Sequence, residues 1–169
     1  MKRLAITLFL TLLFAAAAFS QTNLKVGAEA PLFSAASLDG SGYDLSELRG
    51  SVVVLTFWST KCPICQHEFP KLNRVIDSFD GKKVVFLSLT MENEAKVQSY
   101  LRSNRLASQI LPNSFGVLLQ YADRGKNGNL DIGFPSYFVI DQEGRVQYRS
   151  SGFDKTDSLN AAISRLASK

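Results

Sequence analysis

Two mainly apolar runs stand out in the pattern of hydrophobic and polar positions along the chain. They are SVVVLTFW at residues 51–58 and KVVFLSLT at residues 83–90. Neither run alternates between apolar and polar positions, as a strand with one face in solvent does. Both therefore predict strands that are buried on both faces.

A helical period separates the two runs. Apolar residues recur every three or four positions, which predicts an amphipathic helix over residues 63–78. The predicted inner face of this helix comprises Phe69, Leu72, Val75, Ile76 and Phe79. After the second strand, Glu92 and Glu94 are expected to open another helix, because carboxylates stabilise the positive end of a helix. The apolar face of that helix comprises Val97, Tyr100 and Leu101.

Both ends of the domain carry turn signals. Residues 38–43 are typical of a hairpin, followed by a helical turn with Asp44 or Ser46 as its cap. Residues 136–152 read as two strands joined by a type I turn at 141–144, and a closing helix follows. Its apolar face comprises Leu159, Ile163 and Leu166. The order of elements predicts an α/β fold, with a mixed central sheet flanked by helices and an N-terminal hairpin extension.

The N-terminus has the pattern of an export signal. Lys2 and Arg3 precede an apolar run at residues 4–19, and small residues lead to Gln21. We expect a secretory signal peptide over residues 1–20 and a single domain over residues 21–169. The alternative is an N-terminal membrane anchor, because the run is only slightly shorter than a span of about 20 residues. Export places the protein in the periplasm or another extracytoplasmic compartment, where disulfides persist.

Charge adds little to this interpretation. The formal net charge is +4, and the basic residues are scattered among acidic ones. Since nucleic-acid binding needs a concentrated basic surface, we expect no nucleic-acid partner. We expect the protein to be a monomer.

Both cysteines of the chain lie in one short segment. Cys62 follows the first apolar strand and directly precedes Pro63, a residue favoured at the first helical position. Cys62 is therefore predicted to cap the helix, where unpaired backbone N–H groups stabilise a thiolate more than a thiol. Lys61 adds a positive charge. Cys65 lies one turn further on, so the pair has the spacing of a nucleophile and a resolving thiol.

Three other uses of such a cysteine pair compete with this interpretation. A structural disulfide over this spacing contributes about 2 kcal/mol, against about 3 kcal/mol for a fifteen-residue loop. Zinc commonly takes four ligands, and the chain offers two cysteines and one histidine, His67. A copper(I) carrier that uses Cys62, Cys65 and His67 stays open as a non-enzymatic alternative, because copper(I) prefers soft thiolates.

Three stretches together resemble one family. FWSTKCPICQHEFP at residues 57–70 resembles the active-site segment of thioredoxin-fold proteins, and most of all that of the exported TlpA-like (ResA-like) thiol–disulfide oxidoreductases. Residues 26–58 resemble the N-terminal extension and central strand of that family. GFPSYFVIDQEGRV at residues 133–146 resembles its later strand pair, in which a cis-proline faces the disulfide. Pro135 matches that proline.

The resemblance implies a site and a role for each residue in it. Cys62 and Cys65 would form a redox-active disulfide, with no other cofactor and no metal. Glu68 matches a glutamate that assists proton transfer in the family, and it lies three residues after Cys65 on the same helical face. The alternative for Glu68 is a solvated surface carboxylate. The residues expected to contact a partner are Trp58, Phe134 and Pro135. For Trp58, the alternative is a core aromatic at the end of a strand.

The resemblance also implies partners. We expect exported thiol or disulfide proteins, apocytochrome c among them, and an upstream electron donor in the membrane. A reductase is favoured over an oxidase. A peroxiredoxin is the alternative enzyme, but its P-x-x-x-T-x-x-C pattern would need proline at Leu55 and a hydroxyl at Ser59, and the proline is missing.

Several positions depart from the family pattern or need separate treatment. Ile64 stands where the family often has proline, and Thr56 stands where thioredoxin has a buried aspartate. His67 is expected at the surface. The polar segment 121–133 faintly matches a calcium loop but has Phe134 in place of the bidentate acid, which argues against calcium. We predict instead that this segment selects partners.

Overall fold

The computed structural model describes residues 23–125 and 127–168. The predicted signal peptide and its boundary at residue 21 lie outside these residues. Within the described part of the chain, no helix has the length and hydropathy needed to span a bilayer.

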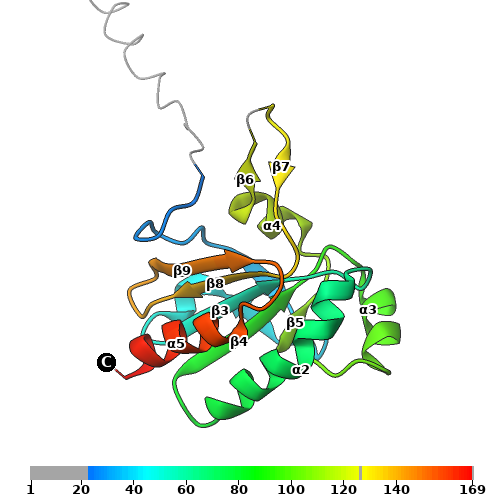
Figure 1. Ribbon diagram of the computed structural model, residues 1–169, viewed down its shortest axis with the longest axis horizontal. Coiled ribbons are helices and arrows are strands. Elements are labelled where there is room, and N and C mark those ends of the chain that lie inside the picture. Colours follow the sequence, from blue (N-terminus) through cyan, green and yellow to red (C-terminus); the bar gives the residue numbers. More distant parts are fainter. Residues whose placement is uncertain (1–22, 126, 169) are drawn as a thin grey trace, which may run out of the picture.

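A five-stranded mixed sheet forms the centre of the domain (Figure 1). Its order is β5-β4-β3-β8-β9, in which β3, β4 and β5 are parallel and β8 and β9 complete the sheet as antiparallel neighbours. The strands are β3 (Val52–Phe57), β4 (Val84–Leu89), β5 (Gln109–Leu111), β8 (Ser136–Ile140) and β9 (Val146–Ser151). The predicted mixed sheet is confirmed, and β5 is an additional strand that the sequence did not reveal.

Each face of the sheet is covered by different elements. One face packs against α2 (Pro63–Ser78), α5 (Thr156–Ala167) and α3 (Glu94–Leu101). The other face packs against α4 (Phe115–Tyr121), the 3₁₀ turn η2 (Leu45–Leu48) and the chain that leads into it. Side chains of β3 alternate between these two cores, and every residue of β3 is buried. This confirms the prediction of a strand buried on both faces.

The predicted helices agree closely with those observed. Helix α2 has the predicted bounds, with Phe69, Leu72 and Phe79 buried and Val75 and Ile76 partly buried against the same core. The predicted faces of α3 and α5 also contact this core. The turn between β8 and β9 closes with a hydrogen bond from the Gly144 N–H to the Asp141 carbonyl, as a β-turn requires.

The start of α3 corrects one prediction. Asn93 is the N-cap of this helix, since its side-chain oxygen accepts a hydrogen bond from the Lys96 N–H at 3.0 Å. Glu94 lies in the first turn, but Glu92 precedes the helix. The carboxylate of Glu92 is instead turned toward the loop after β3, where it accepts hydrogen bonds from the hydroxyls of Ser59 and Thr60.

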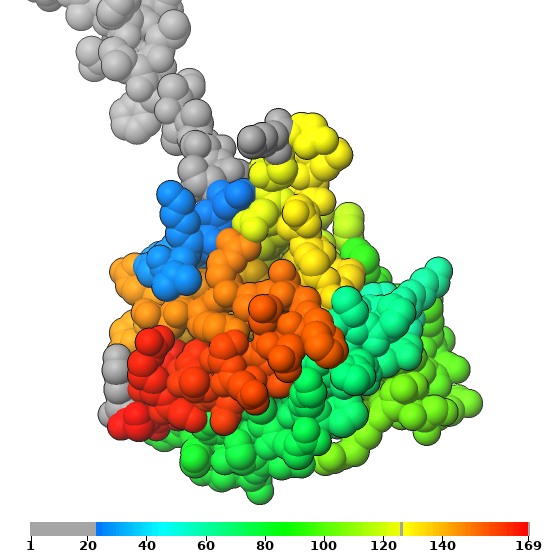
Figure 2. Space-filling view, in the orientation of Figure 1, coloured from blue at the N-terminus to red at the C-terminus, as the bar shows by residue number. Residues whose placement is uncertain are grey.

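Two hairpins extend the sheet domain. Strands β1 (Ser34–Ala36) and β2 (Gly42–Asp44) form the predicted N-terminal hairpin, and Asp44 caps η2 by accepting from the Ser46 N–H at 2.8 Å. Strands β6 (Asp123–Arg124) and β7 (Leu130–Asp131) form a second, short hairpin within the polar segment. Figures 1 and 2 show this second hairpin projecting away from the central sheet.

Candidate active site

The two cysteines form a disulfide at the start of α2. Their Cα atoms are 5.3 Å apart, and Cys62 is the N-cap of the helix, with Pro63 at the first position. The Cys62 sulfur accepts a hydrogen bond from the Cys65 N–H at 3.0 Å. The predicted cap is confirmed. The sulfur of Cys62 therefore lies where the helix N-terminus favours negative charge.

The two sulfurs differ in accessibility. Cys65 is fully buried at 0% exposure, whereas Cys62 is only partly buried. A partner protein can reach Cys62 more easily than Cys65. The geometry therefore suits Cys62 as the attacking sulfur and Cys65 as the resolving one.

The Phe134–Pro135 segment lies at the same edge of the sheet as the disulfide. Phe57 at the end of β3 pairs with Ser136 at the start of β8, so the chain segments beyond both residues meet at that edge. Phe134 and Cys62 also pack against one core cluster. The peptide bond between Phe134 and Pro135 is cis, which confirms the predicted cis-proline. The Pro135 carbonyl accepts a hydrogen bond from the Gly152 N–H at 2.8 Å, which ties this segment to the end of β9.

Trp58 occupies a different place from the one predicted. Its side chain has 0% exposure, and its ring packs against Phe69 and Tyr100 with centroid distances of 5.3 and 5.5 Å. Strand alternation continues past β3 and directs Trp58 toward the core under α2, together with Val54. The predicted contact between Trp58 and a partner is corrected accordingly: the ring is part of the core.

Glu68 is a buried carboxylate. Its side chain has 0% exposure, which contradicts the alternative of a solvated surface residue. One carboxylate oxygen lies 3.3 Å from Lys71 Nζ, and the other is buried with no hydrogen-bond partner among the described residues. Burial first, and then the nearby charge of Glu68, raise the pKa of the Tyr137 phenol. An ionisable group with an unused acceptor thus lies one helical turn from Cys65.

Glu92 is a site residue that sequence reasoning missed. Its carboxylate accepts hydrogen bonds from the hydroxyls of Ser59 (2.9 Å), Thr60 (2.8 Å) and Thr90, and from the Thr60 N–H at 3.1 Å. Lys96 Nζ lies 3.1 Å away. Burial raises the pKa of Glu92, but the hydrogen bonds from Thr90, Thr60 and Ser59 outweigh it and lower the pKa to about 2.

This carboxylate fixes the turn that leads to the nucleophile. Ser59 and Thr60 directly precede Lys61 and Cys62, and the Cys62 N–H in turn donates to the Ser59 carbonyl at 3.1 Å. A signal for Glu92 was present in the sequence. Parallel neighbouring strands end at the same edge of a sheet, so polar residues just after β3 and just after β4 are expected to meet there.

The remaining residues singled out by the sequence contribute less. His67 is exposed, as predicted, and its ring lies 5.2 Å from that of Phe153. Thr56 is buried and pairs with Tyr137 across β3 and β8. Among residues 23–125 and 127–168, no three His, Cys, Asp or Glu side chains are grouped so that they could hold a metal ion.

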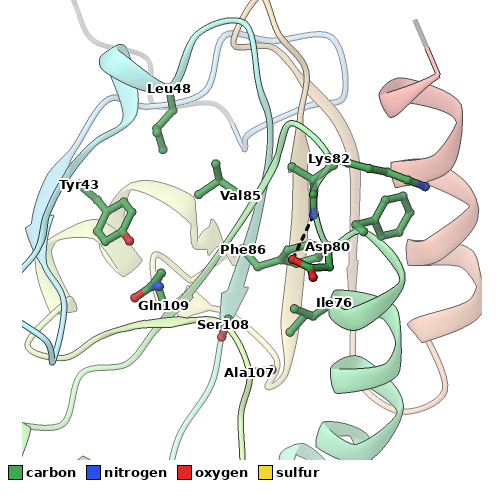
Figure 3. A pocket seen from close by; sticks show the side chains of 13 residues that line it. Tyr43, Leu48, Ile76, Asp80, Lys82, Val85, Phe86, Ala107, Ser108 and Gln109 are labelled. Atoms are coloured by element: carbon green, nitrogen blue, oxygen red, sulfur yellow. Dashed lines mark hydrogen bonds between the residues drawn. The ribbon is translucent and has the colours of Figure 1, made fainter.

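A cavity of about 410 Å³ lies away from the disulfide (Figure 3). Its lining comes from the end of α2, the starts of β4 and β5, and the N-terminal region, with Ile76, Val85, Gln109 and Tyr43 as examples. The 16 residues of α2 span about 24 Å, so this cavity and Cys62 lie near opposite ends of that helix. The cavity is not part of the disulfide site.

Comparisons with known proteins identify a matching family, similar sequences and similar structures. The AhpC/TSA family model matches residues 26–149. The thiol–disulfide oxidoreductase ResA of Bacillus cereus is 28% identical over 148 residues, covering 85% of this chain and 80% of ResA. A crystal structure from Chlorobium tepidum, described as a DsbE-type thiol:disulfide interchange protein, superimposes with a TM-score of 0.74 at 23% identity and covers 86% of this chain and 99% of its own. The peroxidoxin BcpB of Mycobacterium tuberculosis superimposes with a TM-score of 0.69 at 22% identity, over 85% of this chain and 99% of its own.

These similarities confirm the predicted thioredoxin-like fold and the predicted resemblance to ResA-type proteins. The fold, the helix-capping dithiol and the relatives all agree with the enzyme class predicted from the sequence, thiol–disulfide oxidoreductase. The chain belongs to the AhpC/TSA family.

Proposed function

We propose that the protein is an exported thiol–disulfide oxidoreductase that reduces disulfides in other exported proteins. The observation that carries this proposal is the Cys62–Cys65 disulfide at the start of α2, with one accessible and one buried sulfur. The similarity to ResA supports the same chemistry. Export rests on the pattern of residues 1–20.

The reaction uses three side chains. In the reduced enzyme, the Cys62 thiolate attacks a partner disulfide, releases one partner thiolate and forms a mixed disulfide. The Cys65 thiol then transfers its proton to Glu68, and the resulting thiolate attacks the Cys62 sulfur. The second partner thiolate leaves and is protonated, so two electrons pass to the partner. The enzyme is left with the Cys62–Cys65 disulfide.

Partner binding is assigned to the segment beside the disulfide. Phe134 and Pro135 would contact an extended partner strand, and the segment 121–133 would help to select it. Reduction of the enzyme's own disulfide requires an electron donor, which we place in the membrane. Apocytochrome c is the favoured partner, and cytochrome c maturation the favoured process. The enzyme would act as a monomer with the dithiol as its only redox group.

Trapping of mixed disulfides tests the roles of the two cysteines. The Cys65→Ser variant, incubated with an extract of exported proteins, is expected to form covalent adducts that dithiothreitol releases. The Cys62→Ser variant is the matched control and should form none. Adducts on Cys62→Ser alone would reverse the roles, and adducts on neither variant would contradict the proposal. A reduction potential near −270 mV would support a reductase, and one near −120 mV an oxidant.

A peroxidase is the second candidate, because the AhpC/TSA model matches the chain and a peroxidoxin shares its fold. The residues around Cys62 do not favour it. Leu55, at the place of the required proline, is a fully buried strand residue. The Ser59 hydroxyl, at the place of the required threonine, donates to Glu92. Consumption of hydrogen peroxide by the reduced protein, lost in Cys62→Ser, would favour the peroxidase over the reductase.

A further inference from the structure

A lysine connects the buried Glu68 with the surface. Lys71 Nζ lies 3.3 Å from a Glu68 oxygen and 3.0 Å from an oxygen of Asp154. The three side chains are 0%, 31% and 67% exposed in the order Glu68, Lys71, Asp154. The chain of charges therefore runs from the core beside Cys65 to solvent.

Two separate parts of the chain create this arrangement. Glu68 and Lys71 are three residues apart on α2, whereas Asp154 belongs to the segment between β9 and α5. Figure 2 shows that segment, in orange, against α2, in green. Asp154 has a φ of 58°, a left-handed conformation that aspartate tolerates better than most residues. The aromatic ring of Phe153 lies 5.1 Å from Lys71 Nζ and confines the ammonium on one side.

A tyrosine of the central sheet also interacts with Glu68. Tyr137 on β8 is close enough for its pKa to be raised by the Glu68 charge, after the larger effect of burial. Tyr148 on β9 adds to that effect on Tyr137 and shares a hydrogen bond with Ser158 of α5 at 2.7 Å. Lys71 is a cation in direct contact with this buried carboxylate.

We propose that Lys71, held in place by Asp154, is a positioning residue that keeps Glu68 ionised and ready to accept the proton of the Cys65 thiol. This inference rests on the proton-accepting role proposed above for Glu68. The Lys71 ammonium occupies one oxygen of Glu68 and leaves the buried, unpartnered oxygen to receive the proton. The proton moves from the Cys65 sulfur to Glu68 and then to water, while Lys71 stays protonated throughout.

The ion pair between Lys71 and Glu68 matters because Glu68 is buried. Ion pairs between exposed side chains contribute little, because water screens them. A carboxylate with 0% exposure is poorly hydrated, so its ionised form depends on a nearby cation or on hydrogen bonds. The hydrogen bond with Asp154 and the Glu68 charge outweigh desolvation and raise the pKa of Lys71, which keeps the ammonium charged.

The test measures the resolving step alone. Cys62 is loaded as a mixed disulfide with a chromogenic aromatic thiol, and release of that thiol by Cys65 is followed by stopped flow from pH 4 to 9. In Lys71→Met, the midpoint of the pH–rate profile is expected to move up by about one unit, because the missing cation favours the protonated carboxyl. Asp154→Asn should shift it in the same direction by less. Lys71→Arg should restore the wild-type profile.

Two controls separate positioning from a structural effect. Lys82→Met removes a lysine between α2 and β4 that also lies over a phenylalanine ring, at 4.8 Å from that of Phe79, and should leave the profile unchanged. In a Glu68→Gln background, Lys71→Met should cause no further shift. A profile that does not move in Lys71→Met, or that still moves without Glu68, would overturn the inference. Absence of any thiol release by the wild type would instead contradict the proposed function itself.

Discussion

Two carboxylates near the disulfide have opposite surroundings. Glu92 follows β4 and accepts hydrogen bonds from Ser59, Thr60 and Thr90 as well as contacting Lys96. Glu68, on the helix beneath the disulfide, contacts Lys71 through one oxygen and keeps the other without a partner.

The contrast between the two carboxylates separates a structural role from a role in proton transfer. A buried acceptor without a partner costs stability and is retained where it has another use. A carboxylate with all of its acceptor sites occupied is a poor proton acceptor, because protonation would break those hydrogen bonds. Glu92 therefore holds the turn before Cys62, whereas Glu68, with its unpartnered oxygen, is the group to which we assign the proton transfer.

The largest expected effect is on catalysis by the Glu68→Gln variant. The resolving step at pH 7 should slow about 100-fold, since a positioned base contributes a factor of about 10² to 10⁴. The same substitution at Glu92 is the matched control and should slow the step less than about fivefold. Stopped-flow release of the thiol from loaded Cys62 gives both rates. Equal losses in the two variants would remove the distinction between them.

The free energy of unfolding should respond in the opposite way, with a larger loss in Glu92→Gln than in Glu68→Gln. Glu92→Gln should lower the free energy of unfolding by about 2 kcal/mol at pH 7, because the amide cannot accept all of the hydrogen bonds made by the carboxylate. Glu68→Gln should lower it by less than about 1 kcal/mol, because removing a poorly satisfied buried charge offsets the lost ion pair. Urea unfolding of the oxidised proteins measures both values. A larger loss for Glu68→Gln would contradict the assignment.

The contribution of Glu92 to stability should depend on pH. The pKa of Glu92 is lowered from 4.5 to about 2, so its stabilisation is fully present above pH 4.5 and is lost as the pH falls to about 2. Between pH 5 and 2 the wild type should therefore lose about 2 kcal/mol more than Glu92→Gln does. Unfolding curves recorded at intervals across this range test the prediction. Parallel losses in the two proteins would show that Glu92 is not linked to folding in this way.

The smallest expected effect concerns a single hydrogen bond to Glu92. Thr60→Val removes the hydroxyl that donates at 2.8 Å and should cost about 1 kcal/mol of stability. Thr60→Ser keeps a hydroxyl and should cost less than half as much. Thermal unfolding of both variants provides the comparison. If the valine variant is as stable as the wild type, the network around Glu92 is weaker than its geometry suggests.

Sequence patterns revealed the parts of the fold that depend on local spacing. Strand β3 and helix α2 were predicted closely because their apolar positions follow simple periods. Strand β5 is only three residues long, and β6 and β7 are two residues each, too short for a period to appear. These elements depend on neighbouring strands rather than on their own sequence.

The residues of the site also divide into those that local sequence patterns predict and those that depend on contacts between distant segments. Cys62, Cys65 and Glu68 could be placed from helix geometry and from the resemblance to a family, whereas the role of Glu92 depends on two strands lying side by side. Trp58 was placed wrongly, although alternation along β3 puts it on the same face as Val54. The link from Lys71 to Asp154 joins residues 83 positions apart, and no local pattern predicts it.

The central claim is that the start of α2 holds the Cys62 sulfur as a thiolate. Alkylation of the reduced protein with iodoacetamide from pH 4 to 10, with each cysteine followed by peptide mass spectrometry, tests it most directly. We expect a midpoint for Cys62 at least one unit below the value of about 8.5 for free cysteine, and slower reaction of the buried Cys65. Alkylation of Cys62 with a midpoint at or above 8.5 would contradict the account.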